Sequence, residues 1–203
     1  MVNLLYKNEQ SGRSMVEMLG VLAIIGVLSV GGIAGYSKAM TKFKITKTFD
    51  QVSMTVANIR TLYSGQRNYS GLKTDIAYQM GIIPAEMIGS STASLVNAFQ
   101  GQVTIGAVDR NSTAGAFYIS YGNLGREACV SILTADWGSG SSSGFLALSR
   151  ADGSVSNLKA ETPTSVPTAD AAGSKWIATS LPVRPADAAT ACGEYNAVTW
   201  YYQ

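Results

Sequence analysis

The sequence of 203 residues contains no histidine. Histidine supplies the general base of Ser-His-Asp triads and part of the ligand set of most protein zinc sites, so its absence excludes the triads and disfavours the zinc sites. No other convergent motif of polar residues takes its place. We therefore expect no catalytic residue, no metal site and no cofactor, and we do not expect the protein to be an enzyme.

Cysteine is nearly as scarce, with only Cys129 and Cys192 in the chain. Two cysteines without a CxxC spacing are a poor metal-binding set, but they suit one disulfide in an oxidising compartment. Two buried free thiols are the alternative. We predict a disulfide between Cys129 and Cys192.

Charge is also low, at 14% of the residues with a net charge of +2. Seven Lys and Arg stand against three Asp and Glu before residue 65, whereas the remainder has eight against ten. The C-terminal part is therefore faintly acidic and lacks the basic patch of a nucleic-acid binder. No nucleic-acid partner is expected.

Isolated carboxylates and tryptophans have simple interpretations. Solvated turns are expected for Asp136, Asp152 and Asp170, rather than catalytic or calcium-binding roles. Core or subunit contacts are expected for the tryptophans, with a sugar platform as the alternative; these are Trp137, Trp176 and Trp200.

What the sequence does have is a long uncharged stretch, the 20 residues from Met18 to Ser37. As a helix it would be about 30 Å long, which is enough to cross the hydrocarbon core of a bilayer. Glu17 stands at its edge, where a carboxylate costs up to about 3 kcal/mol if it lies deep in apolar surroundings. We therefore expect Glu17 to have a function or a partner.

The residues that follow keep a helical period, but on one face only. Apolar side chains recur every three or four positions in a heptad-like stripe: Ile45, Phe49, Val52, Val56, Ile59 and Tyr63. Polar residues occupy the facing positions: Lys44, Lys47, Asp50, Gln51, Ser53 and Asn58. The pattern predicts one helix from about Ser14 to Tyr63, ended by Ser64 and Gly65. A short coiled-coil dimer is the alternative for the stripe.

The remaining residues alternate between strand-like and helical stretches. Strands are predicted at 102–108, 115–121 and 195–202, and a hairpin at 144–158 with its turn at 151–153. A helix is predicted at 126–137, and short helices near 72–80 and 85–88. Because these elements are segregated from the long helix, we predict an α+β fold in which that helix packs on a head with an antiparallel sheet. The domain boundaries expected are a leader at 1–12, an apolar helix half at 13–37, an amphipathic half at 38–64 and the head at 65–203.

The N-terminal residues resemble the start of a type IV pilin precursor. In that family the leader ends in glycine, the cut follows directly, and glutamate is the fifth residue of the mature chain. Gly12, Arg13 and Glu17 have this spacing. Within that family, the longer leader, the large head and the segments 97–105, 127–133 and 191–200 resemble those of the type IVb branch, which includes thin-pilus pilins of conjugative plasmids. Arg13 departs from the Met, Leu, Val or Phe usual at the first mature position.

The resemblance implies a structural subunit of a type IVb pilus, serving adhesion, aggregation or conjugative mating contact. It implies a cut by a prepilin peptidase between Gly12 and Arg13, N-methylation of Arg13, and a role of Glu17 in subunit assembly. The implied partners are copies of the chain in a helical polymer, the peptidase, the inner-membrane assembly machinery and, before assembly, the membrane. The implied location is the inner membrane of a Gram-negative bacterium with a periplasmic head, and then the extracellular pilus.

Other interpretations remain open. A pseudopilin of a type II secretion system has the same N-terminal motif, and a membrane-anchored periplasmic enzyme or receptor is the alternative from another class. The positive-inside rule opposes a periplasmic head, since four lysines at 38–47 follow the apolar run. The pilin motif and the cysteine pair favour the periplasmic side.

The first prediction concerns the cut. Mass analysis of the mature protein is expected to find its N-terminus at Arg13, because the Gly12-to-Glu17 spacing fits the pilin motif. An intact Met1 in the mature protein would contradict this interpretation. So would an N-terminus near Gly32, where the cut of an ordinary secretory signal would fall.

Overall fold

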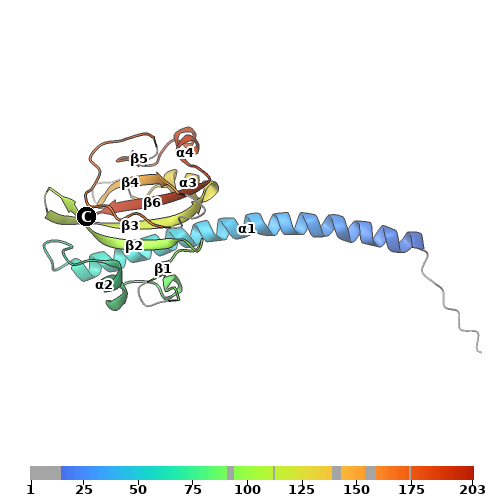
Figure 1. Cartoon of the computed structure of the whole chain (residues 1–203), viewed down its shortest axis with the longest axis horizontal. Helices are drawn as coiled ribbons and strands as arrows, with labels where there is room; N and C mark the ends of the chain where they lie inside the picture. The colour runs from blue at the N-terminus through green and yellow to red at the C-terminus, as the bar shows by residue number, and fades with distance from the viewer. Residues whose placement is uncertain (1–14, 91–93, 112, 139–142, 154–158, 174) are drawn as a thin grey trace, which may run out of the picture. The chain divides into compact units, whose positions relative to one another are not determined.

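A computed structural model describes residues 15–90, 94–111, 113–138, 143–153, 159–173 and 175–203. The chain forms two compact units, Met1–Thr41 and Lys42–Gln203. Helix α1, Met15–Tyr63, contributes to both (Figure 1). The single helix predicted from the sequence is thus confirmed over its described length.

In the first unit the structure describes helix only. Every residue from 15 to 39 is exposed in the isolated chain, including large apolar side chains such as Met15, Leu22 and Val27. A helix that is apolar all round has to be buried in a lipid or protein environment to be stable. Within the described residues, nothing in the chain supplies that environment.

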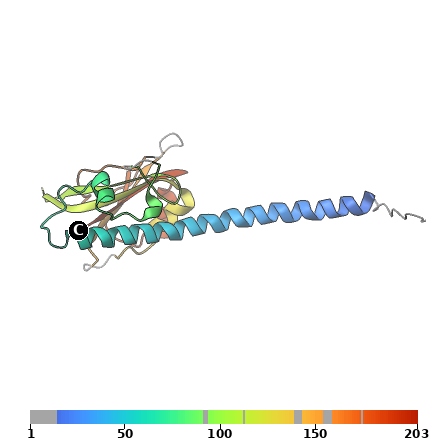
Figure 2. The ribbon, with the colours of Figure 1, turned by 90° about the horizontal axis from the view of Figure 1, so that it is seen from below.

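In the second unit, the rest of α1 lies against a sheet (Figure 2). The predicted stripe faces the core: Ile45, Val52, Val56 and Ile59 are buried, and Phe49 and Tyr63 pack against them. The structure differs at Gln51, which the pattern places on the polar face and which is buried. Its Nε2 donates to Glu86 Oε1 at 2.9 Å, so a partner from another element allows its burial.

The sheet has six strands in the order β1-β2-β3-β6-β4-β5, and every neighbouring pair is antiparallel (Figure 1). The strands are β1 (Leu95–Val96), β2 (Gln102–Arg110), β3 (Thr113–Gly125), β4 (Phe145–Asp152), β5 (Lys175–Ala178) and β6 (Tyr195–Tyr202). The predicted α+β class is therefore confirmed. The last strand, β6, pairs with β3 on one side and β4 on the other, so it lies in the middle of the sheet.

Short helices surround the sheet: α2 (Thr74–Gln79), the 3-10 helix η1 (Ala85–Met87), α3 (Arg126–Leu133) and α4 (Pro185–Ala191). Helix α3 ends at Leu133 rather than at the predicted residue 137. Just after it, the indole nitrogen of Trp137 donates to the Ile132 carbonyl at 2.8 Å. Strand β4 continues through Ala151 and Asp152, which pair with β6, so the predicted turn at 151–153 is wrong. Part of the predicted hairpin, 154–158, lies outside the described residues.

The two faces of the sheet carry different cores. The larger core lies on the face of α1 and is built on Ile59, Tyr121 and Trp200, all fully buried. A smaller cluster around Tyr118 and Tyr201 includes Val166, from the segment that follows Lys159. Burial raises the pKa of the Tyr201 hydroxyl to about 12. Both faces are thus protected from water, one by helices and one by a segment without regular structure.

The second prediction tests the packing of α1. Ile59→Ala is expected to lower the free energy of unfolding by about 2–5 kcal/mol, because it leaves a cavity under the helix. Met54→Ala, on the same helix but 53% exposed, is the matched control, with an expected effect within about 0.5 kcal/mol. Urea denaturation of the full chain in detergent, followed by circular dichroism, measures both. Equal effects of the two substitutions would show that this face of α1 does not anchor the sheet.

Candidate functional site

The first candidate site is the beginning of α1. Glu17 lies in its first turn and is exposed. Amide groups without intrahelical partners at a helix N-terminus favour a nearby carboxylate. Gly12 and Arg13, the residues of the predicted cut, lie outside the described residues. The arrangement therefore places one acidic group at the end of a long apolar surface.

The apolar surface of the first unit is far larger than the patches that soluble monomers usually expose. Its exposed large side chains are Met15, Val16, Met18, Leu19, Val21, Leu22, Ile24, Ile25, Val27, Leu28, Val30, Ile33 and Tyr36. The helix is long and apolar enough to cross a membrane. Such a surface can be buried either in a bilayer or among copies of the same helix.

Polar contacts join the second part of α1 to the loops beside it. Lys47 Nζ lies 3.0 Å from Glu86 Oε2, and Asn58 Nδ2 donates to the Ile82 carbonyl at 2.7 Å. The hydrogen bond from Gln51 and the Lys47 ammonium lower the pKa of the Glu86 carboxyl. Since Glu86 is largely exposed, its ion pair contributes little to stability. The contacts chiefly fix the position of segment 82–86 beside α1.

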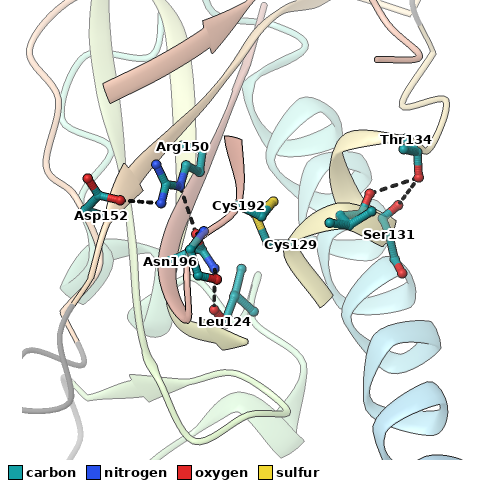
Figure 3. The surroundings of a disulfide bond; sticks show 10 residues. Leu124, Cys129, Ser131, Thr134, Arg150, Asp152, Cys192 and Asn196 are labelled. Carbon is teal, nitrogen blue, oxygen red and sulfur yellow. Dashed lines mark hydrogen bonds and ion pairs between the residues drawn. A yellow bond between two sulfur atoms is a disulfide. The ribbon is translucent and has the colours of Figure 1, made fainter. Parts of the chain in front are cut away.

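The second candidate site surrounds the predicted disulfide, which the structure contains (Figure 3). Cys129 belongs to α3, and Cys192 directly follows α4. Both side chains are buried, and their Cα atoms are 5.9 Å apart. The bond ties α3 to the segment that enters the central strand β6, two parts of the chain separated by 63 positions.

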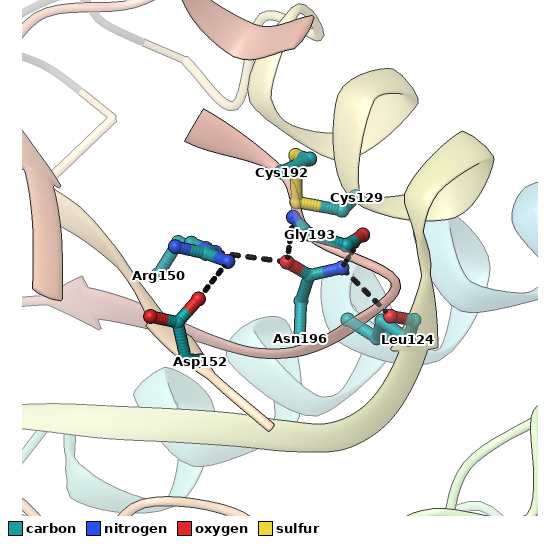
Figure 4. Close-up of polar contacts among 7 residues, drawn as sticks. All are labelled: Leu124, Cys129, Arg150, Asp152, Cys192, Gly193 and Asn196. Atoms are coloured by element: carbon teal, nitrogen blue, oxygen red, sulfur yellow. Dashed lines mark hydrogen bonds and ion pairs between the residues drawn. A yellow bond between two sulfur atoms is a disulfide. The ribbon is translucent and has the colours of Figure 1, made fainter. Parts of the chain in front are cut away.

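Asn196, at the beginning of β6, is the polar centre of this region (Figure 4). Its Nδ2 donates to the carbonyls of Leu124 and Gly193, and its Oδ1 accepts from the Gly193 amide at 2.8 Å. Its Oδ1 also accepts from Arg150 Nε at 2.8 Å. A fully buried amide with this many bonds holds the turn after Cys192 in one conformation.

Arg150 completes the network from β4. It is 4% exposed and pairs with Asp152, which reaches solvent. A buried guanidinium without such partners would cost several kcal/mol. Sequence reasoning missed both Arg150 and Asn196, because a lone arginine and a lone asparagine in strand-like stretches carry no motif.

The other residues singled out in the sequence are dispersed. Trp137 and Trp200 belong to the core and meet edge to face with ring centroids 5.2 Å apart, and Trp176, on β5, is partly buried and packs against the same core. Asp136, Asp152 and Asp170 all make local polar contacts. In the described part of the chain, acidic and cysteine side chains nowhere gather in a group able to hold a metal ion.

Comparisons with known proteins agree on one family. The family model described as PilS N terminal matches residues 42–202. Two relatives named major structural subunit of bundle-forming pilus, from Escherichia coli O111:H- and O127:H6, are 28% identical over 198 residues; the match covers 96% of this chain and 95% of each relative. The toxin coregulated pilin of Vibrio cholerae is 28% identical over 134 residues, 64% of this chain and 59% of that protein.

A solved structure has the same fold. The type IVb pilin from Salmonella typhi aligns with a TM-score of 0.52 at 18% identity, covering 80% of this chain and 99% of the other. At this identity the likeness shows the fold alone. It supports the arrangement of a helix packed on an antiparallel sheet.

The third prediction concerns the disulfide. Replacing Cys129 and Cys192 together by serine is expected to lower the free energy of unfolding by about 4 kcal/mol, the value of the chain-entropy model for a loop of this size. Ser131→Ala, two positions from Cys129 on α3, is the control and is expected to change little. Urea denaturation measures the loss. Two alkylatable thiols in the native protein, or an unchanged midpoint in the double variant, would contradict the prediction.

Proposed function

This chain belongs to the PilS family of type IVb pilins, and we propose that it is the major structural subunit of a type IVb pilus, polymerised through α1. Family membership makes it a structural subunit rather than an enzyme. The relatives that match almost its whole length carry the name of a major pilus subunit, which supports the same role here.

The observation that carries the proposal is the exposed apolar helix of residues 15–39. In a filament, copies of this helix bury one another, and before assembly the same surface is buried in the inner membrane. One segment thus serves two environments at different times, because lipid tails and apolar side chains solvate it about equally well. The head then faces the periplasm, where its disulfide is stable, and later the outside of the cell.

The maturation we propose follows from the same segment. A prepilin peptidase removes residues 1–12, and the new α-amino group of Arg13 is methylated. The inner-membrane assembly machinery then inserts the processed subunit into the growing fibre. We propose adhesion, aggregation or conjugative mating contact as the purpose of that fibre.

Glu17 has a specific role in this proposal. A carboxylate buried among apolar helices needs a partner, because an uncompensated buried charge costs several kcal/mol. The N-terminus of a neighbouring subunit provides one, and pairing with it draws the incoming subunit into register. The guanidinium of Arg13 offers a second, bidentate partner.

The fourth prediction tests this role. Glu17→Ala is expected to leave membrane insertion and leader removal intact but to reduce surface filaments sharply, since the apolar helix is unchanged and only the partner for the N-terminus is lost. Glu17→Asp is expected to form some filaments but fewer than the wild type, because its shorter side chain reaches the neighbouring N-terminus less well. The measurements are filament counts by electron microscopy and detection of processed subunit in membrane fractions.

Asp50→Ala is a matched control, because it removes an exposed carboxylate from the second part of the same helix. It is expected to assemble normally. Normal piliation of Glu17→Ala would mean that apolar packing alone sets the register. Absence of the chain from purified filaments of the wild type would overturn the proposed function itself.

A further inference from the structure

The exposed large apolar side chains of the second unit are confined to one side of it. In the described part of that unit they are Phe43, Met54 and Leu62 on α1, and Met80 and Ile88, which flank the segment 82–86. The described residues of the strands, of α3 and of α4 include none. This apolar surface therefore lies on and beside α1, which covers one face of the sheet (Figure 2).

A groove of about 620 Å³ lies beside α1 within this surface. One wall is the helix itself, where the lining residues Phe43, Lys47, Asp50 and Met54 recur every three or four positions and so share one face over about three turns. The other wall consists of residues 84–86. The ion pair and hydrogen bonds between this segment and α1 hold the two walls together, so the groove is a fixed feature of the head.

The charges in the groove leave little to attract an ion. Lys47 and Glu86 pair with each other, which accounts for two of the three charged residues. Asp50, the third, is exposed and keeps its carboxylate in water at the rim. Phe43 and Met54 are 61% and 53% exposed, so they gain most when the groove is covered. Such a groove favours an uncharged, apolar occupant.

Lipid is a poor occupant for this groove. Charged side chains line it together with the apolar ones, and a charged group among hydrocarbon chains is costly. A protein surface can instead cover the apolar side chains and leave the charged groups at its margin, as protein–protein interfaces commonly do. The occupant is therefore a protein surface with large apolar side chains.

The chain itself has such a surface in its first unit. The apolar part of α1, residues 15–39, is exposed in the isolated chain and carries no charge from Met18 to Ser37. Among the described residues, every exposed large apolar side chain that does not lie on the groove side of the head belongs to this part of α1. Because a pilin polymerises with copies of itself, the apolar part of another copy is also the protein surface nearest at hand.

We propose that the groove beside α1 receives the apolar part of α1 of a second copy. This contact presupposes the proposed function and adds to it the surface of the head that the neighbouring helix touches. The two surfaces in contact are different parts of the chain, so the interface is heterologous. Repeating it extends an open helical polymer, whereas pairing of one surface with itself closes a dimer.

The fifth prediction locates the contact in the fibre. Filaments are prepared from subunits in which the photo-crosslinking residue benzoylphenylalanine, also aromatic, replaces the exposed Phe43. After illumination, the band of twice the subunit mass is analysed by mass spectrometry. Its crosslinks are expected to join position 43 of one copy to residues 15–39 of another. The same replacement at Arg67, which is exposed and does not line the groove, is the control and is expected to give no crosslink to residues 15–39.

Two substitutions measure what the contact contributes to assembly. Phe43→Gln is expected to reduce the number of surface filaments at least about tenfold, because it removes a central apolar contact. Processed subunit in membrane fractions is expected to be unchanged, because this side chain is exposed in the isolated subunit. Leu62→Gln is the matched control, since Leu62 is an apolar residue of the same helix that is 52% exposed and lies outside the groove; it is expected to assemble normally.

Crosslinks from position 43 into residues 43–88 of a second copy would overturn the proposal, because the groove would then pair with its own kind. Filaments without crosslinks to residues 15–39, or normal piliation of Phe43→Gln, overturn it as well. In each of these cases the chain is still the subunit of the fibre, so the proposed function stands. That function fails separately, if the chain is absent from purified wild-type filaments.

Discussion

The packing of one face of α1 onto the sheet is the constraint on which the rest of the structure depends. The change from an all-round apolar pattern to a one-sided stripe falls between residues 37 and 45, close to the boundary of the two units at Thr41. After that boundary Ile45, Val52 and Ile59 are buried by the sheet. Before it, the same type of side chain is exposed and has to find its environment elsewhere. The helix thereby combines folding and assembly in one element.

A polar interior complements this apolar contact. The guanidinium of Arg150 and the amide of Asn196 are buried beside the disulfide. They bond to each other, and their further hydrogen-bond partners are Asp152 and the Leu124 carbonyl. Such networks specify one arrangement of the chain more strictly than apolar packing does, because a misplaced member would leave a buried group unpaired. The disulfide and the network act on the same turn, one by a covalent bond and one by hydrogen bonds. The entry of the chain into the central strand β6 is therefore fixed twice.

Much of the fold was predictable because its signals are local. Periodicity over short stretches predicts the stripe from Ile45 to Tyr63, the strand at 195–202 and the antiparallel class. The disulfide was predictable because the chain has only two cysteines. Other features depended on residues distant in sequence. Gln51 is buried because Glu86 reaches it, β4 runs through its predicted turn because β6 pairs with it, and β5 and α4 lie in a stretch without a clear period.

By itself, the sequence determined the apolar helix, its acidic residue Glu17 and the class of the head, since periodicity and local charge suffice for these. Only the tertiary structure decided which polar residues are central. Asn196 and Arg150 carry no motif, and they matter because folding brings them to the disulfide. Trp200 lies on the central strand β6 and is fully buried, whereas Trp176 lies on the edge strand β5 and is only partly buried. Long-range strand pairing, which no local pattern encodes, decided how deeply these two tryptophans are buried.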